Sequence, residues 1–347
     1  TGILDNKVEV ISSFKGSIRS QKAYPTMISK GVFNPLLIKN EESRPFLRKD
    51  GENQWRIVKG IWNVNEPLVL KGDVYIEAGT KMYFSDEAYF IVSGSVQIRG
   101  RESENVVFDA ISDSWKGFYV LSENNEKSEI EFFNIRKTSA TNPGILNLTG
   151  GFTIYSSDLQ MNNVHIESSI AEDALNIVNS KVNIYNIEID GAISDGFDCD
   201  YCNGAIRSSN ISGINGDALD FSGSNIRLSN IQINDVKDKA VSVGEKSYAH
   251  IENSIFSNVG VGIASKDASS TEAYNVKIND YKLFAAMTYQ KKNIFERRSE
   301  LTISNSDITD EREFKRQIGT YLVVNEKEVK ETELDVGNMY SEGIMKK

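Results

Sequence analysis

A group of aspartates in the middle of the chain has the residue types and the spacing for acid–base or cation chemistry. Asp198 and Asp200 are two positions apart, and Asp220 follows Asp198 by 22 residues. Carboxylates held close together repel one another, so they need a bound cation, a shared proton or nearby lysines. A hard cation such as calcium would use several of their oxygens, whereas a carboxyl with a raised pKa would suit a general acid. The three aspartates are therefore candidate catalytic residues and candidate calcium ligands.

Lysines, tyrosines and further acids follow these aspartates along the chain. A lysine whose pKa is lowered by other lysines can abstract a proton beside a substrate carboxylate, and the candidates are Lys239, Lys246 and Lys266. Candidate substrate-binding residues fall near the same turns, and they are Tyr201, Glu245, Asp267, Tyr289 and Lys291. The simpler alternative is that the lysines only form part of a solvated surface. For Asp173, Asp195 and Asp217 the simpler alternative is that they hydrogen-bond backbone amides at bends.

Short strands must position these residues, because from Trp55 onward apolar and polar residues alternate in brief runs separated by Gly, Asn, Asp and Ser. Such alternation between turn residues predicts strands rather than helices. An internal repeat organises the strands. Similar five-residue segments recur in steps of 22 residues, and they begin at Asp173, Asp195, Asp217, Lys239, Val261 and Leu283.

Two apolar columns emerge when these segments are aligned. The first contains Leu175, Phe197, Leu219, Val241, Ile263 and Ala285, and the second contains Ile177, Cys199, Phe221, Val243, Ser265 and Met287. Apolar columns two residues apart indicate inward-facing strand positions. The column from Asn176 to Ala286 and the column from Val178 to Thr288 should then point outward. Asp198 and Asp220 would be direct neighbours, since stacked strands lie about 4.8 Å apart.

The repeat length, the Asn/Ser/Asp-rich turns and the phrases at 194–198 and 215–220 resemble right-handed parallel β-helices of the pectate-lyase-like superfamily. The resemblance covers about residues 60–310 and implies an all-β solenoid of stacked coils. We expect an N-terminal lead-in or cap over residues 1–54, the β-helix over 55–315, and a C-terminal cap or tail over 316–347. The superfamily contains lyases, hydrolases, epimerases, adhesins and phage tail proteins, so the fold leaves the activity open.

Three functions remain as alternatives, all with a polysaccharide or glycan as partner. The resemblance favours a polysaccharide lyase or epimerase for an acidic glycan, in which the aspartates hold a cation and a lysine removes a proton. A non-catalytic glycan-binding surface protein, adhesin or phage-tail-type protein is the second. An inverting glycoside hydrolase is disfavoured. The spacing of Asp198 and Asp200, roughly 6.5 to 7 Å, would suit it, but the Gly-His-Gly and Arg-Ile-Lys signatures of polygalacturonases are absent.

Composition narrows the partners and the location. The net charge of −10 disfavours non-specific binding to nucleic acid or to an anionic membrane. No apolar run is long enough for membrane insertion, and no signal peptide is recognisable. We expect an extracellular or cell-surface location. A first residue Thr1 is consistent with a processed product or an excised domain, and the oligomeric state stays open. Cys199 and Cys202 are expected as packed thiols in preference to a disulfide.

Overall fold

The computed structural model describes residues 8–14, 17–23, 44–123, 125–143, 146–308 and 313–345. The chain divides into two compact units, Thr1–Leu37 and Ile38–Lys347. In the first unit, β1 (Val8–Phe14) and β2 (Ser17–Ala23) pair as an antiparallel hairpin. Both strands fall within the predicted lead-in over residues 1–54. Residues 1–7, 15–16 and 24–43 of that lead-in lie outside the described residues.

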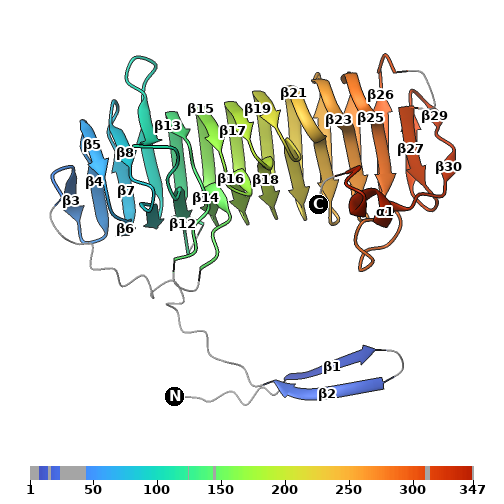
Figure 1. Cartoon of the computed structure of the whole chain (residues 1–347), viewed down its shortest axis with the longest axis horizontal. Coiled ribbons are helices and arrows are strands. Elements are labelled where there is room, and N and C mark those ends of the chain that lie inside the picture. Colours follow the sequence, from blue (N-terminus) through green and yellow to red (C-terminus); the bar gives the residue numbers. More distant parts are fainter. Residues whose placement is uncertain are drawn as a thin grey trace. The chain divides into compact units, whose positions relative to one another are not determined.

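The second unit is the predicted parallel β-helix, drawn as a row of stacked coils in Figure 1. It begins with an antiparallel pair, β3 (Leu47–Gly51) with β4 (Gln54–Ile57), and continues by parallel pairing between successive coils. The coils form three sheets. Each coil buries its inner face only against its neighbours, so the stack as a whole builds the core.

Sheet 1 consists of β4, β7 (Asp73–Ile76), β10 (Val96–Arg99), β22 (Tyr248–Glu252), β24 (Ser270–Tyr274), β26 (Glu300–Ser304), β28 (Tyr321–Val324) and parts of longer strands. Sheet 2 begins with β5 (Ile61–Val64), β8 (Lys81–Phe84) and β11 (Val106–Ala110). Four strands bend through the corner between these sheets: β13 (Lys127–Arg136), β15 (Asp158–Ser169), β17 (Lys181–Ala192) and β19 (Asn203–Ile214). Residues with positive φ at this corner include Asn163 and Asn186, and asparagine tolerates that conformation well.

Sheet 3 carries the candidate site. It contains β6 (Leu68–Lys71), β9 (Phe90–Ser93), β12 (Phe118–Leu121), β14 (Gly150–Tyr155), β16 (Asp173–Val178), β18 (Asp195–Asp200), β20 (Leu219–Ser222), β27 (Phe314–Gln317) and β30 (Glu331–Thr332). The C-terminal parts of β21 (Asn225–Gly244), β23 (Ile255–Lys266) and β25 (Lys277–Tyr289) complete it. A short β29 (Lys327–Glu328) pairs with β28, and α1 (Val336–Ser341) follows β30.

The predicted inward columns are confirmed through five copies of the repeat. Residues from Leu175 to Ile263 in the first column and from Ile177 to Ser265 in the second have 0% exposure. For the sixth copy, the prediction of a constant 22-residue step is wrong by one residue. A bulge between Val259 and Val261 makes the next step 23 residues, so Ala264 pairs with Met287 and Lys266 pairs with Tyr289. Met287 and Tyr289 therefore belong to the outward columns in place of Ala286 and Thr288.

The expectation of two free thiols was also wrong, because Cys199 and Cys202 form a disulfide. Both residues are buried, at 0% and 2% exposure. The turn after β18 directs Cys202 back toward the interior, where its Cα lies 5.9 Å from that of Cys199, within the usual range for a disulfide. Sequence spacing alone did not reveal that the turn residue points inward.

The segment 334–345 does not continue the stack. After β30 it turns back to place α1 beside sheet 3, near β23 and β25 (Figure 1). Within the described residues, no helix has both the length and the apolar character needed to cross a membrane.

Candidate functional site

Three outward columns of sheet 3 position the candidate residues. Column A contains Asp173, Asp195, Asp217, Lys239, Val261 and Phe284. Column B contains Asn176, Asp198, Asp220, Ser242, Ala264 and Met287. Column C contains Val178, Asp200, Ser222, Gly244, Lys266 and Tyr289. From β18 onward, each column changes from acidic to cationic or apolar residues along the stack. The predicted pairing of Asp198 with Asp220 is confirmed.

Column A forms a chain of hydrogen bonds between successive coils. Asp195 accepts a hydrogen bond of 2.8 Å from the backbone N–H of Asp217. Asp217 in turn accepts one of 3.0 Å from the backbone N–H of Lys239. Asp173 instead accepts one of 2.9 Å from Asn176 Nδ2 within its own strand. The expectation that these aspartates hydrogen-bond backbone amides at bends is thus confirmed for Asp195 and Asp217.

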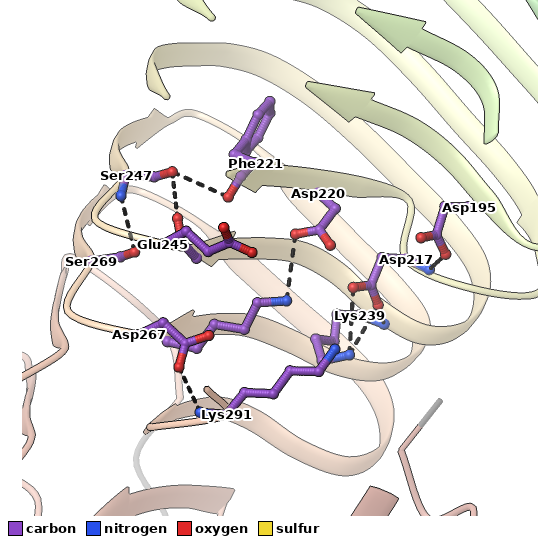
Figure 2. Close-up of polar contacts among 12 residues, drawn as sticks. Asp195, Asp217, Asp220, Phe221, Lys239, Glu245, Ser247, Asp267, Ser269 and Lys291 are labelled. Carbon is purple, nitrogen blue, oxygen red and sulfur yellow. Dashed lines mark hydrogen bonds and ion pairs between the residues drawn. The ribbon is translucent and has the colours of Figure 1, made fainter. Parts of the chain in front are cut away.

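Column A contains a buried ion-pair group at Lys239. The Lys239 Nζ lies 3.1 Å from Asp217 Oδ1 and 2.7 Å from Asp238 Oδ2, and its side chain is only 1% exposed. Figure 2 shows Lys239 reaching back toward Asp217. Burial lowers the pKa of Lys239, but the adjacent carboxylates outweigh burial and raise it well above its usual value. Burial would likewise raise the pKa of Asp217, but Lys239 and Lys266 lower it overall.

A second buried lysine joins columns B and C. Lys266 Nζ lies 3.5 Å from Asp220 Oδ1, and their side chains are 5% and 20% exposed. Burial opposes the charge of Lys266, but Asp220 raises its pKa above the usual value. Lys239 and Lys266 are therefore held as ammonium groups in this arrangement. Their predicted role as general bases remains a prediction that requires their ion pairs to open.

The other carboxyls of the face resist ionisation. Burial, followed by repulsion from Asp173, Asp200 and Asp220, raises the pKa of Asp198 to about 9. Burial and Asp217 raise the pKa of Asp195 to about 8, and burial raises that of Asp173 to about 7. Burial and Glu245 also raise the pKa of Asp200. Near neutral pH, Asp198 and Asp195 can therefore donate hydrogen bonds, a property suited to general acids.

Lys291 differs from the two buried lysines. Burial, together with repulsion from Lys266 and Lys239, lowers its pKa. Figure 2 shows its side chain extending toward Asp217 and Lys239. Its ammonium lies 4.6 Å from the ring centre of Tyr340, a residue of α1. A lysine with a lowered pKa is a better proton acceptor near neutral pH than an ordinary one.

The remaining predicted residues lie at the turn that follows sheet 3. Asp267 accepts 2.7 Å hydrogen bonds from the backbone N–H groups of Lys291 and Lys292, which makes it a turn-stabilising residue. Glu245 pairs with Lys292. Tyr201 is 65% exposed and lies where a side chain at Gly223 would otherwise be. The structure thus places Tyr201, Glu245 and Asp267 at the edge of the face. Tyr289 lies within column C, and Lys246 is an exposed turn residue.

The predicted calcium ligands have suitable oxygen chemistry, but their arrangement is not a ready ligand set. Among the residues that the structure describes, no three His, Cys, Asp or Glu side chains converge as metal ligands. Asp220 is moreover engaged by Lys266. Calcium binding by Asp198, Asp200 and Asp220 therefore remains a prediction.

Sequence reasoning missed two components of the face. The pairing of Lys239 with Asp217 and Asp238 had a signal, because a lysine follows three aspartates in the column that begins at Asp173. Tyr340 had none, because it lies outside the repeat. Its hydroxyl lies 2.7 Å from that of Tyr289, and its ring centre lies 5.6 Å from Lys239 Nζ.

Comparisons with known proteins support the architecture. No model of a known protein family matches the chain, and no curated protein matches it. Among solved structures, its fold is similar to that of the periplasmic alginate epimerase AlgG. The TM-score is 0.52 at 10% identity, over 82% of this chain and 80% of that chain. Two further matches have TM-scores of 0.41: Dettilon tailspike protein, at 8% identity over 77% and 61% of the chains, and a GH87 alpha-1,3-glucanase catalytic domain, at 12% over 78% and 60%. At these identities the likeness establishes the β-helix fold alone.

Proposed function

We propose that sheet 3 processes an acidic polysaccharide by proton abstraction beside the sugar carboxylate, as an epimerase or a lyase does. The observation that carries this proposal is one face with two oppositely shifted groups: Asp198, whose pKa is about 9, and Lys291, whose pKa is lowered. Groups with displaced pKa values at one site are typical of acid–base catalysis. The similarity in fold to a protein named an alginate epimerase supports the substrate class.

The proposed step uses residues of this chain only. Neutral Lys291 takes the proton from the carbon beside the substrate carboxylate, and protonated Asp198 donates a hydrogen bond to that carboxylate as negative charge builds on it. Return of a proton to the other side of the carbon gives epimerisation. Departure of the neighbouring glycosidic oxygen, with a proton from the site, gives elimination and a new double bond. Protonated carboxyls also lessen the repulsion that an acidic polymer would otherwise meet.

The same proposal places the protein in an extracellular or periplasmic compartment. The Cys199–Cys202 disulfide supports this, because disulfides persist mainly in oxidising environments. The solved epimerase with a similar fold is also described as periplasmic.

An inverting glycoside hydrolase is the second candidate, and one observation favours it. Asp198 has the raised pKa of a general acid, and Asp200 follows two residues later on the same strand. Two residues span roughly 6.5 to 7 Å, inside the carboxyl separation of inverting enzymes.

The deciding experiment offers acidic and neutral polysaccharides to the protein in D2O, with calcium or with a chelator. Ultraviolet absorbance reports unsaturated ends, reducing-end analysis reports hydrolysis, and NMR reports deuterium uptake beside the carboxylate. Deuterium uptake or unsaturation that is lost in Asp198→Asn and Lys291→Met supports the proposal. The matched control is Glu188→Gln, an exposed site on β17. Reducing ends alone identify a hydrolase, and binding without turnover identifies a non-catalytic glycan-binding protein.

A further inference from the structure

The outward columns of sheet 3 become apolar where the C-terminal segment lies against them. Column A ends in Val261 and Phe284, and column B ends in Ala264 and Met287. These residues pack with side chains of the segment 334–345, of which Val336, Tyr340 and Met345 are buried. The segment thus covers an apolar platform on the outside of the β-helix, directly beside Lys239 and Lys266.

Tyr340 connects this cover to the candidate site. Its ring lies over two ammonium groups, at 5.6 Å from Lys239 Nζ and 4.6 Å from Lys291 Nζ. Cations are attracted to the face of an aromatic ring. The hydrogen bond between the hydroxyls of Tyr340 and Tyr289 fixes the ring in place. Tyr340 therefore occupies space over the lysines that a ligand group could otherwise use.

The short helix and the few hydrogen bonds of this segment indicate that it can detach from sheet 3. Helix α1 has six residues, too few for a helix to persist in water without tertiary contacts. The segment is joined to the coils by the Tyr289–Tyr340 hydrogen bond and by one from Gln317 Nε2 to the carbonyl of Leu334, at 3.2 Å. It adds no strand to the sheets, whereas β23 and β25 are held by parallel pairing with neighbouring coils. Local opening has the lowest free-energy cost in such peripheral segments.

A buried hydroxyl lies on the same face. Ser242 follows Asp220 in column B and has 0% exposure, and its Oγ has no hydrogen-bond partner among the described residues. Buried polar groups are normally satisfied, so an unsatisfied one marks a position where a water or a ligand hydroxyl can bind.

We propose that residues 334–345 are a displaceable cover of the site, and that an acidic saccharide replaces the Tyr340 ring over Lys239 and Lys291. The identity of the ligand rests on the function proposed above, whereas the displacement of the cover does not. In the closed form the segment is autoinhibitory, because the Tyr340 ring occupies the space over Lys291, the proposed base. The tail is then part of the site and not only an end cap.

Two measurements on the full-length protein test the cover without any glycan. Acetylation of lysines with a limiting reagent, read by mass spectrometry, should modify Lys239 and Lys266 far less than exposed Lys277 and Lys282. Tyr340→Ala should raise the modification of Lys239 and Lys266 several-fold. The matched control Tyr274→Ala, at an exposed tyrosine of β24, should not. Unchanged protection in a Tyr340→Ala protein that melts like the parent would overturn the proposal.

Hydrogen exchange of the unmodified protein covers the case in which Tyr340→Ala does not fold. Amides of 336–345 should exchange faster than those of β23 and β25. If the segment instead exchanges together with these strands, it is not a separate cover and the proposal fails. With an acidic polysaccharide present, Tyr340→Ala should bind more tightly than the parent. Absence of any binding, together with exposed lysines, would refute the proposed substrate while leaving the cover intact.

Discussion

At the residue scale, the main feature of this face is that burial makes ionisation of its carboxyl groups unfavourable. Six aspartates lie in columns A, B and C, but the two buried lysines pair only with Asp217, Asp238 and Asp220. Burial raises the pKa of each aspartate that has no lysine partner, and it raises the pKa of Asp198 to about 9. The net charge of this face therefore changes over the physiological pH range.

Replacing Asp198 by asparagine should stabilise the protein at high pH and change little at low pH. The folded-state pKa of Asp198, about 9, exceeds its ordinary value of 3.8. The folded state thus binds more protons than the unfolded state between these values, and stability falls as pH rises through the window. We expect Asp198→Asn to be more stable by on the order of 1–3 kcal/mol near pH 9, and about equal near pH 4. Urea unfolding across this range measures the difference, with Glu188→Gln as the control. A constant difference at all pH values would contradict the raised pKa of Asp198.

Removing the Lys239 ammonium should be strongly destabilising. Lys239→Met would leave Asp217 and Asp238 buried without their counter-ion, which costs about 3–5 kcal/mol in comparable buried pairs. Lys237→Met, two residues earlier at an exposed position, should change stability by less than about 0.5 kcal/mol. Adding Asp217→Asn to Lys239→Met should recover part of the loss. Chemical denaturation of the parent, Lys239→Met, Asp217→Asn and the double variant gives the coupling energy. Equal stability of Lys239→Met and Lys237→Met would mean that Lys239 is not buried as an ion pair.

At the scale of the element, a column of serines stabilises the turn that follows sheet 3. The Ser180 hydroxyl accepts from the backbone N–H of Ser157, and those of Ser224, Ser247 and Ser269 accept from residues of the preceding coils. Cys202 occupies the serine position of its own coil and is bonded to Cys199 instead. The disulfide therefore replaces one link of the hydrogen-bond column.

A serine at position 202 should restore that link. In a Cys199→Val background, Cys202→Ser should be more stable than Cys202→Ala by about 1 kcal/mol, the usual net value of an intramolecular hydrogen bond. Thermal unfolding of the two proteins under identical conditions measures the difference. Equal stabilities would show that the backbone N–H of Ser180 does not need an acceptor at position 202.

The elements also show what the sequence could and could not predict. Apolar residues at 175–177, 197–199 and 219–221 recur at a fixed step, so the fold, the inward columns and the pairing of Asp198 with Asp220 followed from periodicity. The bulge near Val259 added one residue, and beyond it a fixed step assigned Ala285, Ala286 and Met287 to the wrong columns. Tyr340 lies outside the repeat, where periodicity carries no information about contacts. The Lys239 ion pairs depend on side-chain burial, which the spacing alone does not give.

At the scale of the whole molecule, the stack separates its charges along its length. The coils that contain β16, β18 and β20 present aspartates, while the following coils present Lys239, Lys266 and the apolar platform covered by the tail. A solenoid allows this because each coil contacts mainly its neighbours, so an outward column can change character without altering the core. The candidate site lies at the transition, where an acidic ligand would meet ammonium groups only after approaching an acidic surface.

That surface sets the salt dependence of binding. With a net charge of −10, the chain repels an acidic polysaccharide at long range, and salt screens this repulsion within about 10 Å at 0.1 M ionic strength. We therefore expect affinity for an acidic polymer, measured by calorimetry with a chelator present, to hold or rise as salt increases from low to moderate concentration. It should also rise as pH falls from 9 toward 6, because Asp198, Asp195 and Asp173 gain protons over that range. A neutral polysaccharide is the control, since its affinity should not follow salt. A steep loss of affinity with salt would instead indicate that attraction to basic residues outweighs this long-range repulsion, and would contradict the prediction.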